Sequence, residues 1–272
     1  MRALLKSGAL IPCSLRAQGF RQIKTYGAQI YSFMKYIYGP IKSRRLGLSL
    51  GISLSADKIC NLDCVYCQWG SVGKTFSERK EYAKADDVIL ELKTWIQNNP
   101  QEFKELKFVT FSGLGEPTLN ISIGKLIDQV RVITGVNIAV ITNSTLLGDP
   151  LVRKEILKVD LIVPSLDAVD AVIFKQIDRP DACLKLKEII DGLVTLRKEF
   201  SGKIWLEVML VAGINDDFSH IEKLQKVIQL INPDKIQLNS PVRSTAEKNI
   251  LGVNKIKLSK IKEILGNKAE IV

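Results

Sequence analysis

The sequence predicts an α/β protein made of six strand-helix units in a row. Two observations support this fold class: six short apolar segments have the length and pattern of strands, and each is followed by a segment with apolar residues at helical spacing. Strands that alternate with helices run parallel and are joined by right-handed helical crossovers. A chain of 272 residues with 46% hydrophobic and 25% charged residues can form one large domain with a full core.

The elements follow one another with clear boundaries. The expected strands span residues 46–55, 107–113, 137–143, 160–167, 203–212 and 235–239. The expected helices lie after them, around residues 86–96, 123–133, from 149, 186–196, 217–231 and 258–265. Asp149-Pro150 combines a capping side chain with a proline at the first helical position, which is a common helix start. Because parallel strands end at one edge, the site is expected where their carboxyl ends meet, as in closed barrels.

Three of the five cysteines, Cys60, Cys64 and Cys67, lie within one short loop after the first strand, with the spacing CxxxCxxC. Three thiolates can bind three irons of a [4Fe-4S] cluster, and the fourth iron then stays open for a ligand that is not protein. A zinc site would need a further Cys or His nearby, and the one histidine, His220, is far along the chain. A disulfide framework suits a small secreted chain better. We therefore expect a cluster with an open iron.

This cysteine motif resembles that of the radical S-adenosylmethionine (radical SAM) superfamily. The resemblance implies a (β/α)6 partial TIM barrel and two cofactors, a [4Fe-4S] cluster and S-adenosyl-L-methionine (SAM). It also implies reductive cleavage of SAM to a 5′-deoxyadenosyl radical, which abstracts hydrogen from a substrate, and an electron donor such as flavodoxin or ferredoxin. The segment Met34 to Gly51 is similar to the opening of a prokaryotic group related to wyosine-type enzymes.

The same resemblance divides the chain. In that group the chain usually starts near the equivalent of Met34, so residues 34–272 are expected to be the radical SAM core domain. Residues 1–33 contain Lys6, Arg16, Arg21 and Lys24 but no acid. We expect them to be an extension without function, such as a misassigned start.

Residues at the strand ends match the SAM-binding positions of the family. Gly113, Gly115 and Glu116 stand where a Gly-Gly-Glu-Pro motif binds the methionyl amine, although Leu114 is inserted here. The resemblance assigns the rest of SAM to Asn143, Ser165 and Asp167, with Tyr66 and Val211 near the adenine. Asp167 as a plain helix cap is the alternative.

The inner positions of later strands predict the substrate side of the site. Glu207 is an acid among apolar residues, so it must be paired inside the barrel or bound to a ligand. We expect Glu207 and Arg45 to be catalytic. Gln237, Asn239, Arg44 and Arg243 are further candidates for contact with a polar or anionic substrate, with solvated arginines as the alternative. His220 lies near an expected helix start, and we expect it to be a surface or cap residue.

Composition limits the remaining choices. Cys13 and Cys183 are too few for a second cluster, and labile thiolate chemistry predicts the cytoplasm. No segment approaches the roughly 18 apolar residues of a membrane span. A net charge of +10 is compatible with nucleic acid or with a lysine-rich solvated surface. The substrate stays open between a tRNA, as in wyosine synthesis, and a partner protein that receives a glycyl radical, and a non-catalytic [4Fe-4S] electron carrier or sensor is the alternative of another class.

Overall fold

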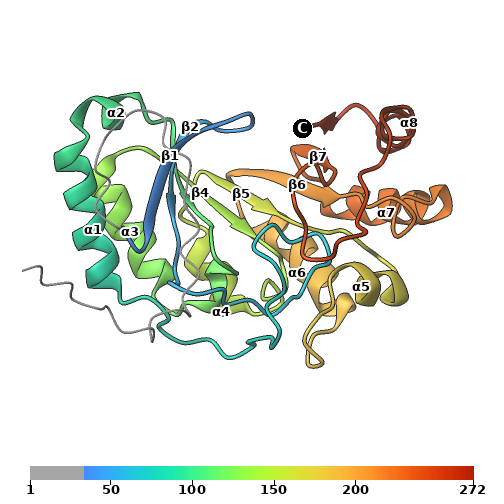
Figure 1. Ribbon diagram of the computed structural model, residues 1–272, viewed down its shortest axis with the longest axis horizontal. Coiled ribbons are helices and arrows are strands. Elements are labelled where there is room, and N and C mark those ends of the chain that lie inside the picture. Colours follow the sequence, from blue (N-terminus) through green and yellow to red (C-terminus); the bar gives the residue numbers. More distant parts are fainter. Residues whose placement is uncertain (1–33) are drawn as a thin grey trace, which may run out of the picture. The chain divides into compact units, whose positions relative to one another are not determined.

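The computed structural model describes residues 34–272. The extension expected at residues 1–33 lies outside the described residues. One eight-stranded sheet runs through the described residues in chain order, β1 to β8 (Figure 1). The strands are β1 Ile37–Ser43, β2 Gly47–Ile52, β3 Phe108–Phe111, β4 Asn137–Thr142, β5 Leu161–Pro164, β6 Lys203–Met209, β7 Lys235–Asn239 and β8 Ala269–Ile271.

Helices alternate with the strands from β2 onward. They are α1 Ala85–Asn98, α2 Pro100–Glu105, α3 Ile123–Thr134, α4 Pro150–Ile156, α5 Ala171–Ile177, α6 Leu186–Glu199, α7 Phe218–Ile231 and α8 Lys255–Leu265, with a 3-10 turn at Pro117–Leu119. The strands from β2 to β8 pair in parallel, and only β1 pairs antiparallel with β2. An α/β fold with a largely parallel sheet is therefore confirmed, and it has the form of a partial TIM barrel.

The six predicted strands correspond to β2 through β7, each followed by at least one helix, so the six strand-helix units are confirmed. The structure adds two edge strands that the sequence analysis did not predict, β1 and β8. β1 was missed because Gly39-Pro40 interrupts its pattern, and proline is tolerated there because β1 is an edge strand. β8 has three residues, and α2 and α5 have six and seven, so each is too short to show a period.

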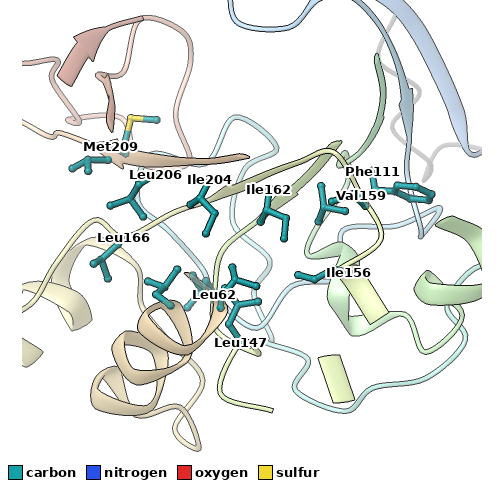
Figure 2. Close-up of a cluster of buried hydrophobic side chains, with 14 of the residues drawn as sticks. Leu62, Phe111, Leu147, Ile156, Val159, Ile162, Leu166, Ile204, Leu206 and Met209 are labelled. Carbon is teal, nitrogen blue, oxygen red and sulfur yellow. The ribbon is translucent and has the colours of Figure 1, made fainter. Parts of the chain in front are cut away.

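The two faces of the sheet differ in what covers them. One face packs on the helices, and residues such as Ile162, Ile204 and Leu206 are fully buried there against Leu62 and Leu147 (Figure 2). Alternate side chains point to the other face, here called the inner face. A small apolar cluster on the inner face contains Leu46, Ala139, Leu161 and Val163. Leu46 comes from the β1-β2 turn, so this turn covers the inner face at the amino ends of the parallel strands.

Candidate active site

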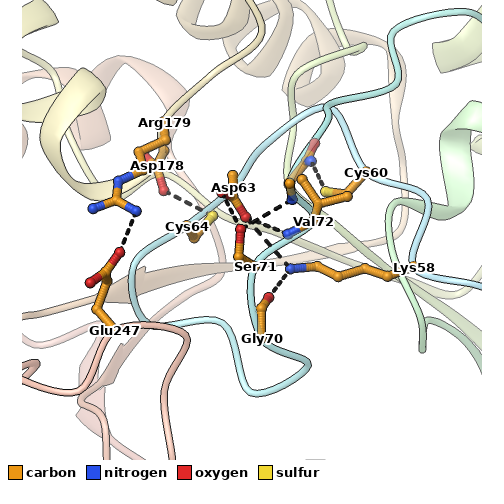
Figure 3. A network of polar contacts seen from close by, with 12 residues as sticks. Lys58, Cys60, Asp63, Cys64, Gly70, Ser71, Val72, Asp178, Arg179 and Glu247 are labelled. Atoms are coloured by element: carbon orange, nitrogen blue, oxygen red, sulfur yellow. Dashed lines mark hydrogen bonds and ion pairs between the residues drawn. The ribbon is translucent and has the colours of Figure 1, made fainter. Parts of the chain in front are cut away.

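The cysteine loop follows β2 and lies at the carboxyl edge of the sheet. Cys60, Cys64 and Cys67 are free thiols and are partly buried. The loop is closed by Asp63, whose Oδ1 accepts a hydrogen bond from Val72 N at 2.6 Å and whose Oδ2 accepts one from Ser71 Oγ at 2.7 Å (Figure 3). These contacts fix the loop in one conformation without using the thiols.

The glycine turn after β3 is joined directly to the start of this loop. Ile59 N donates to Leu114 O at 3.0 Å, and Glu116 N donates to Ile59 O at 2.9 Å. Gly115 has a φ of +138°, and a Cβ there would lie 1.8 Å from the Ile59 carbonyl oxygen. The sequence analysis explained this glycine by the close approach of a ligand to the backbone. The structure supplies a different reason, because the backbone of Ile59 already fills the space beside Gly115.

Glu116 is buried and joins the ends of β3 and β4. Its Oε1 accepts bonds from Thr118 N, Thr118 Oγ1 and Thr142 Oγ1 at 3.0, 2.6 and 2.7 Å, and its Oε2 accepts one from Asn143 N at 2.6 Å. Burial raises the pKa of Glu116, and these hydrogen bonds oppose that shift. Oε2 carries one of these bonds and so keeps a lone pair that an ammonium group could use.

The partly buried Tyr66 and two buried aspartates form a polar network behind the cysteine loop. The Tyr66 hydroxyl donates to Asp167 Oδ2, and Met209 N donates to Asp167 Oδ1 at 2.8 Å. The Cys64 thiol lies 3.4 Å from Asp178 Oδ1. Burial raises the pKa of Asp167 to about 7 and that of Asp178 well above its usual value. Asp170, and not Asp167, caps α5, so the helix-cap alternative for Asp167 is wrong.

Four of the predicted SAM-binding residues lie around one space. Tyr66, Asn143, Ser165 and Asp167 line the same pocket of about 20 Å³, together with apolar side chains of α5 and α6. Val211 does not line it. Its backbone N–H donates to Asn215 Oδ1 at 2.8 Å and its carbonyl accepts from Ile214 N at 3.1 Å. Contact between Val211 and adenine remains a prediction.

Arg45 and Glu207 meet on the inner face although they lie far apart in sequence. Arg45 Nη1 forms an ion pair with Glu207 Oε2 and lies 3.3 Å from Gln237 Oε1. The side chains of Arg45 and Glu207 are 23% and 14% exposed, so solvent reaches the pair. Glu207 is therefore paired inside the barrel, which was the first of the two alternatives raised by its position.

Other candidates lie elsewhere. Arg44 is exposed, and Arg243 is exposed with Nη1 3.2 Å from Gln68 Oε1. The prediction that His220 is a surface or cap residue was wrong, because His220 is 3% exposed and Asp217 is the cap of α7. Neither ring nitrogen of His220 has a hydrogen-bond partner among the described residues, and burial lowers its pKa.

Sequence reasoning missed three polar residues beside the cysteines. Asn61, Thr145 and Asp178 are all buried, and each contacts a cysteine or the Asn143 side chain. Asn61 stood inside the cysteine motif and offered a weak signal, since an amide between metal ligands can orient them. Thr145 and Asp178 carried no local signal, because their positions depend on the path of the chain after β4 and α5.

The three thiols of the loop are the donor set that a [4Fe-4S] cluster with an open iron requires. Burial raises the pKa of Cys60 to about 12 and that of Cys64 well above its usual value, so both are neutral until iron replaces the proton. In the described residues, no three His, Cys, Asp or Glu side chains converge as the ligands of one metal ion do. In a [4Fe-4S] cluster the thiolates do not share one metal ion, because each thiolate binds a different iron. The donor set of three free cysteines in one loop fits that group.

Between residues 34 and 272, no helix combines the length and the apolar character needed to cross a membrane.

Comparison with known families gives one match that covers most of the described domain. The model of the radical SAM superfamily matches residues 57–225. This range contains the cysteine loop, the glycine turn and Glu207.

Two curated relatives extend the similarity. A UPF0026 protein from Methanocaldococcus jannaschii is 36% identical over 83% of this chain and 75% of its own length. A protein from Brachyspira hyodysenteriae named GTPase Obg is 37% identical over 84% of this chain, but the chain spans only 33% of that protein. Among solved structures, a radical SAM methyltransferase from Sphaerobacter thermophilus has a TM-score of 0.65 at 15% identity, covering 82% of this chain and 65% of that one. At that identity the likeness concerns the fold.

Proposed function

The chain belongs to the radical SAM superfamily, and from this premise we propose that it is an enzyme that cleaves SAM reductively and uses the resulting radical to take hydrogen from a polar substrate. Cys60, Cys64 and Cys67 would hold the [4Fe-4S] cluster. The bound cluster and SAM supply the chemistry, which is one-electron cleavage of the sulfonium to a 5′-deoxyadenosyl radical.

The observation that carries this proposal is the junction between the cysteine loop and the glycine turn. Two backbone hydrogen bonds of 3.0 and 2.9 Å link Ile59 to Leu114 and Glu116. The junction therefore sets the cysteines and the Glu116 carboxylate at one edge of the sheet. A cofactor with an amino group would find both an open iron and a nearby buried acceptor at this edge.

The polar side chains at the carboxyl edge have separate roles in this proposal. Oε2 of Glu116 accepts a hydrogen bond from the methionyl amine, while its other contacts keep the carboxylate in place. Tyr66, Ser165 and Asp167, which lie together around a separate small pocket, would contact the remainder of SAM at the carboxyl edge. The Tyr66 hydroxyl is oriented by Asp167, because burial keeps the tyrosine protonated.

Arg45 and Glu207 are placed to bind the substrate. Their partly exposed ion pair lies on the inner face, and Ser165 at the end of β5 is bridged to Glu207 on β6. Ser165, which lines the small pocket, is therefore the backbone neighbour of Glu207 on the adjacent strand. A substrate that reaches the ion pair meets a guanidinium, a carboxylate and the amide of Gln237, which favours a polar group able both to donate and to accept hydrogen bonds.

The test is anaerobic reconstitution of the full chain with iron and sulfide, followed by reduction with dithionite in the presence of SAM and chromatography for 5′-deoxyadenosine. We expect a visible absorbance spectrum like that of other [4Fe-4S] proteins, and we expect release of 5′-deoxyadenosine. If the protein with a reduced cluster forms no 5′-deoxyadenosine, even with cell extract as a source of substrate, the result would contradict the proposal and favour an electron carrier or sensor.

The substrate arm of the same experiment compares additives. Unfractionated tRNA tests the wyosine-like alternative, and a protein fraction tests the activation of a glycyl-radical partner. Stimulation of 5′-deoxyadenosine release by one additive identifies its class as the substrate. Replacing dithionite with reduced flavodoxin or ferredoxin tests the expected electron donor.

A further inference from the structure

The Asn143 side chain faces the cysteine loop. Its Nδ2 lies 3.6 Å from Cys60 Sγ and 2.9 Å from Asn61 Oδ1. We propose that Asn143 is a positioning residue for the cluster, whose amide donates a hydrogen bond to the Cys60 sulfur and thereby raises the reduction potential of the cluster. The inference rests on the proposed function, and it revises the sequence-based role of Asn143 as a contact of SAM.

The orientation of the amide is fixed by its other atom. Asn143 Oδ1 accepts hydrogen bonds from Thr145 N at 3.1 Å and from Thr145 Oγ1 at 2.6 Å. Thr145 Oγ1 in turn accepts a bond from Asn61 Nδ2 at 2.8 Å. Turning the Asn143 amide over would set its oxygen against the Asn61 oxygen and leave both Thr145 donors without a partner. The N–H group must therefore face the sulfur.

The backbone at Asn143 is held as firmly as its side chain. Asn143 N donates to Glu116 Oε2 at 2.6 Å, and the next residue, Ser144, has a φ of +70°, which is a costly conformation for a residue other than glycine. The Ser144 hydroxyl is fixed by donation to Ser165 O at 2.7 Å. These contacts turn the chain sharply after β4 and direct Asn143 back toward the cysteines.

A donor at this sulfur has a defined electrical effect. A reduced cluster carries one more negative charge than the oxidised one, and part of that charge lies on the cysteine sulfurs. An N–H group aimed at sulfur stabilises the reduced state more, which raises the potential. The donor comes from a neutral amide, so it can do this without adding a charge that would also attract or repel SAM.

The test is a redox titration of the reconstituted full chain without SAM, followed by electron paramagnetic resonance of the reduced cluster. In Asn143→Leu, which removes the donor at similar size, we expect the ratio of reduced to oxidised cluster at a given potential to fall about threefold to tenfold. A tenfold fall is about 59 mV for a one-electron couple. Thr145→Val should shift the potential in the same direction by less, and Thr145→Ser should restore it.

A matched control separates this role from general loss of a buried amide. Asn120 is fully buried, whereas Asn143 is partly buried, and the Asn120 Nδ2 donates to Leu54 O at 3.2 Å and Ala83 O at 3.0 Å, away from the cysteines. Asn120→Leu should destabilise the fold and leave the potential of the assembled cluster unchanged. An equal shift in Asn120→Leu would overturn the inference.

Other outcomes are equally distinct. An unchanged potential in Asn143→Leu, together with weaker SAM binding, would overturn the inference and return Asn143 to SAM. If Asn143→Leu fails to assemble the cluster, the Thr145 variants decide, and an unshifted potential in Thr145→Val contradicts the inference. Failure of the unaltered chain to assemble a cluster would instead defeat the proposed function.

Discussion

The carboxyl edge of the sheet and the Arg45-Glu207 pair on the inner face are built in opposite ways. At the edge, the cysteine loop and the glycine turn come from adjacent strands and are linked through backbone atoms of Ile59, Leu114 and Glu116. On the inner face, the pair is formed by side chains 162 residues apart. The arrangement at the carboxyl edge is therefore determined by local motifs, whereas the arrangement on the inner face depends on how the β1-β2 turn folds across the sheet.

The strongest way to break the edge is to remove one thiol. Cys64→Ala should abolish both the cluster absorbance and the release of 5′-deoxyadenosine, because two cysteines cannot hold the cluster in this form. Cys183→Ala is the matched control, since Cys183 is an exposed free thiol and should be dispensable for both readouts. Cleavage retained in Cys64→Ala would refute the ligand assignment.

The junction itself is tested by Gly115→Ala. The new methyl group would collide with the Ile59 carbonyl, whose backbone cannot move without shifting Cys60, and the φ of +138° adds strain. We expect a loss of about 3 kcal/mol or more in the free energy of unfolding, measured with urea, and poor retention of the cluster.

Gly135→Ala serves as the control for that variant. Gly135 also has a positive φ, +62°, but a Cβ there has open space around it. Its cost should be about 1 kcal/mol, from backbone conformation alone. Equal losses in the two variants would show that contact with Ile59 is unimportant.

The pH dependence of stability tests the buried acids behind the edge. The pKa of Asp167 is raised to about 7 in the folded protein, so between pH 4 and 7 the folded state holds a proton that the unfolded state has lost. Stability of the cluster-free chain should therefore fall as the pH rises through this window, with a slope of up to about 1.4 kcal/mol per pH unit from this group. Urea unfolding of Asp167→Asn, which keeps an acceptor for Met209 N, should show a flatter profile. Identical slopes in the two proteins would contradict the assignment.

A double-mutant cycle of Arg45→Met and Glu207→Gln measures the coupling free energy of the inner-face ion pair. Removing one partner leaves the other charge half-buried, so each single change should cost about 1 to 3 kcal/mol, and the double variant should cost less than their sum. Urea denaturation measures the coupling. The exposed pair Lys187 and Asp191 is the control and should show far weaker coupling, as is usual at the surface. Additive effects for Arg45 and Glu207 would show that the pair is not formed.

Much of the fold was predictable because its central elements are long and regular. β2 through β7 and the larger helices follow apolar periods that local sequence displays, and their alternation implies a parallel sheet. β1, α2, α5 and β8 were not predictable, since they are short or interrupted and are stabilised by packing on neighbours. The burial of His220 was also missed, because its position in the first turn of α7 suggested exposure, while packing against the rest of the chain encloses it.

The sequence by itself determined the superfamily, the three cysteines and the glycine turn, because close spacing and tight turns require particular residues at particular positions. Tertiary structure alone decided which side chains those motifs meet. It brought Glu116 to the end of β4, turned Asn143 onto Cys60, set Asp178 against Cys64 and paired Arg45 with Glu207. These contacts join residues far apart in the chain, and only the packing of the helices and the β1-β2 turn on the sheet brings such residues within reach of one another.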